Sequence, residues 1–142
     1  TFTLKLEDEN GNELTNLYPC EYPKDANGTI QSGDTFTLKA RESITINGLP
    51  YGTVYTIEET EKSGYTVSYQ INGSRAEEGR KASGDITEGQ SDVKVVYTNK
   101  VRPKLPETGG NGTFPYVVGG MALMALPPAY KFRRRKKEEK LQ

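Results

Sequence analysis

The chain begins with Thr1-Phe2-Thr3-Leu4-Lys5-Leu6-Glu7-Asp8, which is the clearest indication of its fold class. Apolar and polar residues alternate along it, so Phe2, Leu4 and Leu6 share one face of an extended chain. The next four residues, Glu9-Asn10-Gly11-Asn12, have the composition of a tight turn. The pattern predicts a β-strand with one buried face that ends in a turn.

Further short runs of this kind fill the first hundred residues, and none of them has helical periodicity. Turns rich in Gly, Asn and Pro separate the runs at intervals of roughly ten residues. The predicted strands are residues 1–8, 18–22, 35–39, 43–46, 54–59, 65–71 and 93–99, and the polar stretch 74–91 reads as a loop or a weak edge strand. We therefore expect an all-β fold, an Ig-like antiparallel β-sandwich of about seven strands.

Charge is distributed unevenly although the whole chain is neutral. Residues 1–100 contain ten Lys or Arg and sixteen Asp or Glu, whereas residues 131–142 contain seven basic and two acidic residues. A mildly acidic body with a basic tail indicates two environments, one of them beside an anionic surface. Cys20 is the single cysteine and there is no histidine, so we expect no intramolecular disulfide and no Cys/His metal site. No other motif predicts a metal site or a cofactor.

The character of the chain changes after residue 100, where we place the end of the β-domain. Residues 101–112 form a linker, and residues 113–130 are apolar and uncharged, long enough to span about 27 Å as a helix. Residues 131–142 form a basic tail whose cations stop transfer and stay cytoplasmic; they include Arg133, Arg134, Arg135, Lys136 and Lys137. Because the chain has no initiator Met and starts inside a strand, we expect it to be a C-terminal fragment.

The linker contains Leu105-Pro106-Glu107-Thr108-Gly109, which resembles the LPXTG sorting motif of Gram-positive proteins that sortases anchor to the cell wall. The resemblance implies that a sortase cysteine attacks the Thr108 carbonyl, that Gly109 leaves, and that Thr108 is joined to a peptidoglycan precursor. The chain would then be a substrate and not an enzyme, secreted, held briefly in the membrane and finally bound to the wall. The alternative is a plain single-pass anchor in which the pentapeptide has no role.

Three short motifs of the β-domain resemble collagen-adhesin B-type (CnaB-like) and pilin-type isopeptide domains. They are the Phe-Thr-Leu opening at Phe2, the stretch Gly52-Thr53-Val54-Tyr55-Thr56-Ile57-Glu58-Glu59, and the closing Val95-Val96-Tyr97-Thr98-Asn99. Domains of this kind often form an amide bond between a Lys and an Asn, promoted by a buried Glu. The resemblance implies that such a bond is the one reaction this chain would carry out on itself.

Strand alternation tests which residues could make that bond. Glu59 is in phase with Tyr55 and Ile57, and Asn99 is in phase with Tyr97, so both are predicted to face inward. Lys5 lies opposite the apolar face of its strand, and regular pleating turns it to solvent. The resemblance places the bonding lysine on a strand upstream of this fragment. The alternative is that Glu59 is a rim carboxylate and Asn99 a residue that ends a strand.

We interpret the β-domain as a stalk or spacer of an adhesin or a pilus-related surface protein. Its expected partners are a sortase, the cell-wall precursor, the membrane before sorting, and a host or matrix ligand. The competing interpretation is a secreted, wall-bound enzyme whose catalytic domain lies upstream and shares this anchor. Nucleic acid is not an expected partner, because the basic tail follows a membrane span.

Overall fold

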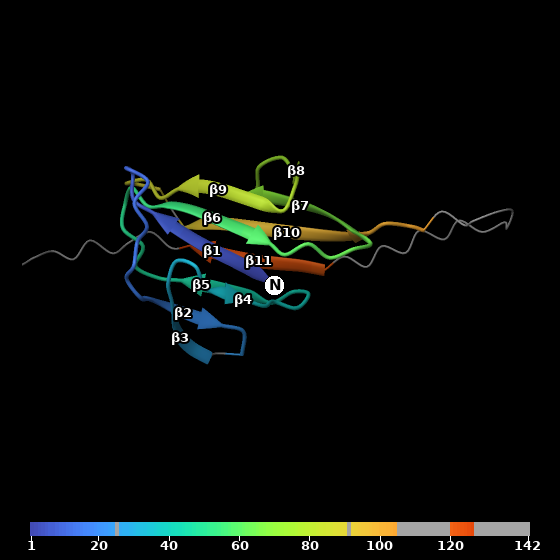
Figure 1. Cartoon of the computed structure of the whole chain (residues 1–142), viewed down its shortest axis with the longest axis horizontal. Helices are drawn as coiled ribbons and strands as arrows, with labels where there is room; N and C mark the ends of the chain where they lie inside the picture. The colour runs from blue at the N-terminus through green and yellow to red at the C-terminus, as the bar shows by residue number, and fades with distance from the viewer. Residues whose placement is uncertain (25, 91, 105–119, 127–142) are drawn as a thin grey trace, which may run out of the picture.

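A computed structural model describes residues 1–24, 26–90, 92–104 and 120–126, and within these ranges the chain is all-β, as predicted (Figure 1). Its eleven strands are β1 (Phe2–Glu7), β2 (Tyr18–Tyr22), β3 (Ala26–Ile30), β4 (Thr35–Phe36), β5 (Ser43–Ile46), β6 (Val54–Glu59), β7 (Tyr65–Ile71), β8 (Glu77–Glu78), β9 (Lys81–Asp85), β10 (Val93–Val101) and β11 (Gly120–Leu126).

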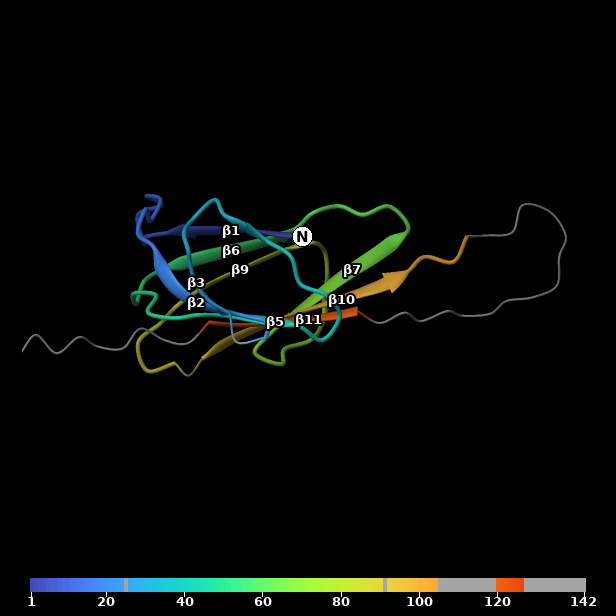
Figure 2. The same cartoon turned by 90° about the horizontal axis from the view of Figure 1, so that it is seen from below.

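The strands form two sheets. The first has the order β4-β1-β6-β9, and the second has the order β3-β2-β5-β11-β10-β7-β8. Figure 2 shows the two layers from the side, with β1, β6 and β9 in one and β2, β5, β11 and β10 in the other. Neighbouring strands are antiparallel, except that β11 and β5 are parallel.

The core lies between the two layers and follows the predicted alternation. In β1 the side chains of Phe2, Leu4 and Leu6 are at most 2% exposed, while the residues between them face solvent. Phe2 stacks on Phe36 with ring centroids 5.4 Å apart and meets the tilted ring of Tyr97 at 5.1 Å. This aromatic group fills one end of the sandwich.

The structure contains more strands than the seven predicted. One of them lies in a segment that reads as a turn, and two lie in the stretch predicted as a loop or a weak edge strand. β3 includes Asn27-Gly28, a pair typical of turns. Gly28 nevertheless lies within strand β3. A side chain is disfavoured there, because a Cβ atom would lie 2.8 Å from the Tyr22 ring. β8 and β9 lie in the polar stretch 74–91, and each is the last strand of its sheet, as the edge-strand alternative predicted. The estimate of about seven strands was nevertheless too low.

Strand β9 is held in place by an aromatic residue of the opposite sheet. The Tyr97 hydroxyl accepts a hydrogen bond from the Ala82 backbone N–H at 3.1 Å and donates one to the Ile57 carbonyl at 2.6 Å. One buried phenol thereby satisfies polar groups of two neighbouring strands. These hydrogen bonds join residues that are distant in sequence. The polar sequence of β9 alone therefore does not indicate what holds this strand in the sheet.

The predictions for the C-terminal region fall mostly outside the described residues. These include the sorting motif at residues 105–109, the basic tail at 131–142 and most of the apolar segment 113–130. Within that apolar segment, residues 120–126 form strand β11 where a helix was expected, because β10 and β5 offer it backbone partners on both sides. No helix among the described residues is long and apolar enough to cross a membrane.

Candidate functional site

A carboxyl and an amide meet between the two sheets. Glu59 is the last residue of β6, and Asn99 lies near the end of β10 in the other sheet. Asn99 Nδ2 donates a hydrogen bond to Glu59 Oε1 at 2.7 Å. The structure thus brings together the two residues that strand alternation predicted to face inward.

The pair lies beside the aromatic end of the core. Glu59 is the register partner of Phe2 across β1 and β6, and Asn99 follows two residues after the fully buried Tyr97. Glu59 Oε2 is itself buried and has no hydrogen-bond partner among the described residues. Because buried polar atoms are nearly always paired, this oxygen marks a place for an additional hydrogen-bond donor.

A hollow of about 470 Å³ opens next to the pair. Its lining includes Glu59, Asn99, Thr1, Lys62, Tyr65 and Val67. The Thr1 carbonyl accepts a hydrogen bond from the Thr60 backbone N–H at 2.9 Å, which fixes the start of β1 at the edge of this hollow.

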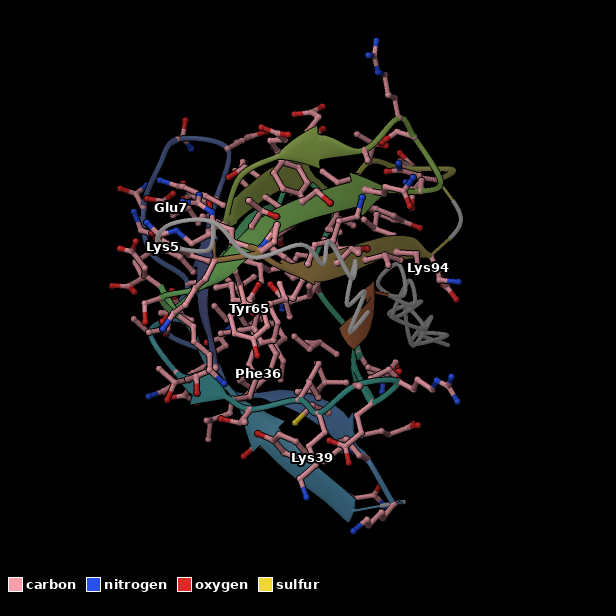
Figure 3. All side chains as sticks on the ribbon, turned by 90° about the vertical axis from the view of Figure 1, so that its right-hand side faces the viewer. Lys5, Glu7, Phe36, Lys39, Tyr65 and Lys94 are labelled. Atoms are coloured by element: carbon pink, nitrogen blue, oxygen red, sulfur yellow. The ribbon has the colours of Figure 1, made fainter. Side chains whose placement is uncertain are left out.

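Lys5 lies away from the pair. Its amine forms an ion pair with Glu7 at 2.7 Å, and about half of its side chain is exposed, 53%. Figure 3 shows Lys5 and Glu7 together at the outer side of the molecule. The hydrogen bond and charge of Glu7 raise the pKa of Lys5, which stabilises the protonated amine in this ion pair.

Lys62 also lines the hollow, although strand alternation does not predict this. Its amine lies 5.2 Å from the centroid of the Tyr65 ring, within the range of a cation–π contact. It lies three residues after Glu59, beyond the end of β6, so strand alternation does not predict the direction of its side chain. Only its closeness to Glu59 in the sequence suggests that the two residues could be neighbours.

The arrangement is suited to amide exchange. Glu59 lies within hydrogen-bond distance of Asn99 Nδ2, the atom that would leave if an amine attacked the Asn99 side-chain carbonyl. For such a reaction the pair would offer a carbonyl and a carboxyl close to the leaving nitrogen, and an amine would have to come from a third group.

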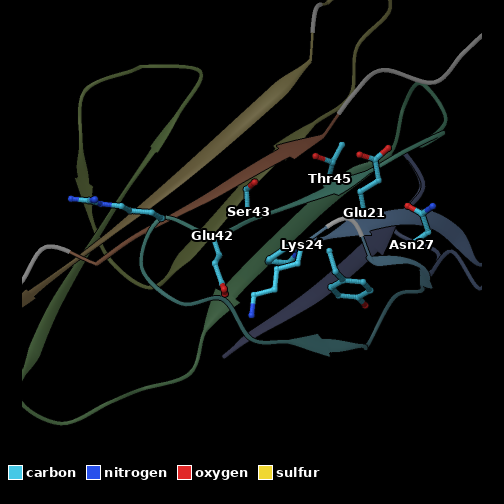
Figure 4. A pocket seen from close by; sticks show the side chains of 9 residues that line it. Glu21, Lys24, Asn27, Glu42, Ser43 and Thr45 are labelled. Atoms are coloured by element: carbon cyan, nitrogen blue, oxygen red, sulfur yellow. The ribbon is translucent and has the colours of Figure 1, made fainter.

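A second hollow, of about 500 Å³, lies beside the β2–β3 hairpin. Figure 4 shows Lys24 and Glu42 on one side of it and Glu21 and Asn27 on the other. None of its lining residues is fully buried, and its charges are mixed. We assign no ligand to it. In the described part of the chain, no three His, Cys, Asp or Glu residues are grouped so that they could hold a metal ion.

The fold and this pair define a class of domain: an all-β sandwich whose two sheets are joined by a partly buried carboxyl–amide contact. The chain belongs to the family described as "Domain of unknown function (DUF7601)", whose model matches residues 1–101. It is also 34% identical, over 109 residues, to the pilus tip adhesin Cpa of Streptococcus pyogenes. That match covers 76% of this chain and 15% of the adhesin, so the chain spans a small part of its relative. No solved structure matches the chain significantly.

Proposed function

We propose that this chain is part of a Gram-positive surface adhesin or pilus-related protein, in which a CnaB-like β-domain serves as a stalk. The observation that carries the proposal is the identity to a pilus tip adhesin over most of the chain. The order of the remaining sequence supports it, because a sorting motif, an apolar segment and a basic tail follow the domain.

We further propose that a sortase cuts this chain between Thr108 and Gly109 and joins Thr108 to peptidoglycan. The Arg102 backbone N–H donates a hydrogen bond to the Gly64 carbonyl at 2.7 Å, and residues 102–104 are exposed. The motif thus begins directly after an exposed stretch. Pro106 disfavours helix at Leu105, which gives an enzyme groove an extended peptide to bind.

Expression in a Gram-positive host tests this anchoring, with a secretion leader on the chain and strains that have or lack sortase. We expect the chain in the wall fraction only when sortase is present. Thr108→Ala should move it to the membrane fraction, whereas Glu107→Ala, at the variable position of the motif, should leave it in the wall. A membrane location in every strain and variant would refute sortase anchoring.

The β-domain, we propose, also holds two of the three groups of an intramolecular cross-link. A lysine amine from sequence preceding Thr1 would enter the hollow and attack the Asn99 side-chain carbonyl. The new bond joins the lysine nitrogen to that carbonyl carbon. Glu59 carries one proton from the lysine nitrogen to the Asn99 nitrogen, the bond between the Asn99 carbonyl carbon and its nitrogen breaks, and ammonia leaves. The buried Glu59 Oε2 without a partner is the observation that supports an incoming amine.

Intact-mass measurement tests the cross-link. The longer polypeptide should weigh ~17 Da less than its sequence because ammonia is lost, and Glu59→Gln or Asn99→Ala should restore the full mass. The present chain should have its full mass. A loss of ammonia in the present chain, abolished by Lys62→Arg, would instead identify Lys62 as the amine, and a longer polypeptide of full mass would refute the cross-link.

A further inference from the structure

Strand β11 joins two halves of the larger sheet. It is antiparallel to β10 over seven positions, from Val93 opposite Leu126 to Asn99 opposite Gly120. On its other side it is parallel to β5 over three positions, from Leu123 opposite Ser43 to Ala125 opposite Thr45. Among the described strands, β3-β2-β5 and β10-β7-β8 are connected through β11 alone, and Figure 2 shows β5, β11 and β10 in one layer.

The residues of β11 do not favour a strand by themselves. The stretch Gly-Met-Ala-Leu-Met-Ala-Leu has no β-branched and no aromatic residue, and Ala, Leu and Met are among the strongest helix formers. β10, by contrast, is rich in Val, Thr and Tyr. The extended form of residues 120–126 is therefore imposed by the backbones of β10 and β5. Strand β11 ends at Leu126, and the next two residues in the sequence, Pro127 and Pro128, have no backbone N–H to donate to a neighbouring strand.

We propose that the gap between β10 and β5 is a strand-acceptor site, which residues 120–126 fill by β-augmentation and vacate when they enter a membrane as a helix. Its ligand class is a short, extended, apolar and uncharged peptide segment. The backbone edges on either side supply the hydrogen bonds, as in other cases of strand addition. The vacating step rests on the membrane span in the proposed function, whereas the acceptor site does not.

The two locations of this segment exclude each other. In hydrocarbon every backbone polar group must be satisfied within the segment, which requires a helix of about 20 residues for a single span. In the sheet the same backbone groups are bonded to β10 and β5. When residues 120–126 leave, both neighbours become edge strands above the buried side chains of Val95, Tyr97 and Ile44. An empty site would then accept another strand of the same chemistry.

Disulfide trapping in the full chain tests the acceptor site. Lys94 and Ala125 are register partners, and a Cys pair at directly opposite positions is close enough to bond. The test variant carries Lys94→Cys and Ala125→Cys. The matched control carries Lys94→Cys and Met121→Cys, which is displaced by four residues, or roughly 13 Å along the strand, and so keeps the same strand parity. Both carry Cys20→Ala so that no third thiol takes part.

In solution with a mild oxidant, the first pair should form a disulfide and the control pair should not. Equal yields for the two pairs, or no disulfide in the first pair while circular dichroism shows a folded chain, would overturn the acceptor site.

Adding anionic phospholipid vesicles tests the vacating step. The disulfide yield of the first pair should fall several-fold when the chain sediments with the vesicles. An unchanged yield in vesicle-bound chain would overturn the exclusion between sheet and membrane. A chain that does not bind vesicles would refute the membrane span and the vacating step with it, while the acceptor site would stand on the result in solution.

Discussion

Asn99 and Glu59 are joined by a hydrogen bond of 2.7 Å between Nδ2 and Oε1, and this contact links the two sheets of the sandwich. The two residues are 40 positions apart in sequence. Their meeting depends on the lengths of β6 and β10, which end at the same edge of the molecule beside the start of β1. The contact is thus a product of the topology, and its contribution to stability can be measured without any cross-link.

Asn99→Ala should lower the free energy of unfolding by about 1–3 kcal/mol, because it leaves the partly buried Glu59 carboxyl with no hydrogen-bond partner for either oxygen. Urea unfolding at neutral pH measures the change. The control is Lys100→Ala, at the exposed next position of the same strand, which should cost less than about 0.5 kcal/mol. Equal costs for the two variants would contradict a structural role for the pair.

Tyr97→Phe should destabilise the domain by about 1–3 kcal/mol, because it leaves the Ala82 N–H and the Ile57 carbonyl buried without their partner. Tyr69→Phe is the matched control, since the Tyr69 hydroxyl bonds to an exposed carboxylate, Glu77, and its loss should cost under about 1 kcal/mol. Urea unfolding of both variants checks the difference. A larger loss for Tyr69→Phe would show that β9 is not held through Tyr97.

Stability should fall as the pH rises above about 10. Burial, aided by the charge of Asp85, raises the pKa of Tyr55 from 10.0 to about 12, and burial also raises the pKa of Tyr97. Above pH 10 the unfolded chain loses phenol protons that the folded chain keeps, so the free energy of unfolding decreases until the folded pKa is passed. For Tyr55 this amounts to about 2–3 kcal/mol, fully present below pH 10.

Urea titrations between pH 9 and about 12 measure this loss, and the absorbance of ionised tyrosine reports the titration itself. Tyr55→Phe should make the decline shallower, because one of the buried phenols is removed. Stability that stays constant while all tyrosines titrate together near pH 10 would contradict the burial of these two residues.

Local alternation was enough to predict most of the fold. The predicted runs 43–46, 54–59 and 65–71 coincide with β5, β6 and β7, because their apolar residues are in strict phase and turn residues flank them. The same alternation predicted that the side chains of Glu59 and Asn99 face inward. These predictions required only the knowledge of which face of its strand each side chain occupies.

The missed features depend on contacts between distant residues. Gly84 lies in β9, where a Cβ atom would collide with the Tyr55 phenol, so a residue that reads as a strand breaker is required there. Nothing in the local sequence indicates this close approach. Lys62 was missed for a related reason, since its place in the hollow is set by the turn after β6 and not by strand periodicity.

The measurement that tests the anchoring proposal most directly is the mass of this chain after incubation with a purified sortase and a triglycine amine. The account predicts a product that ends at Thr108 and carries the amine, together with a released fragment that starts at Gly109. An uncut chain, in a reaction where the same enzyme cuts a control peptide, would contradict it and leave a membrane-anchored β-domain in which the pentapeptide is only a linker.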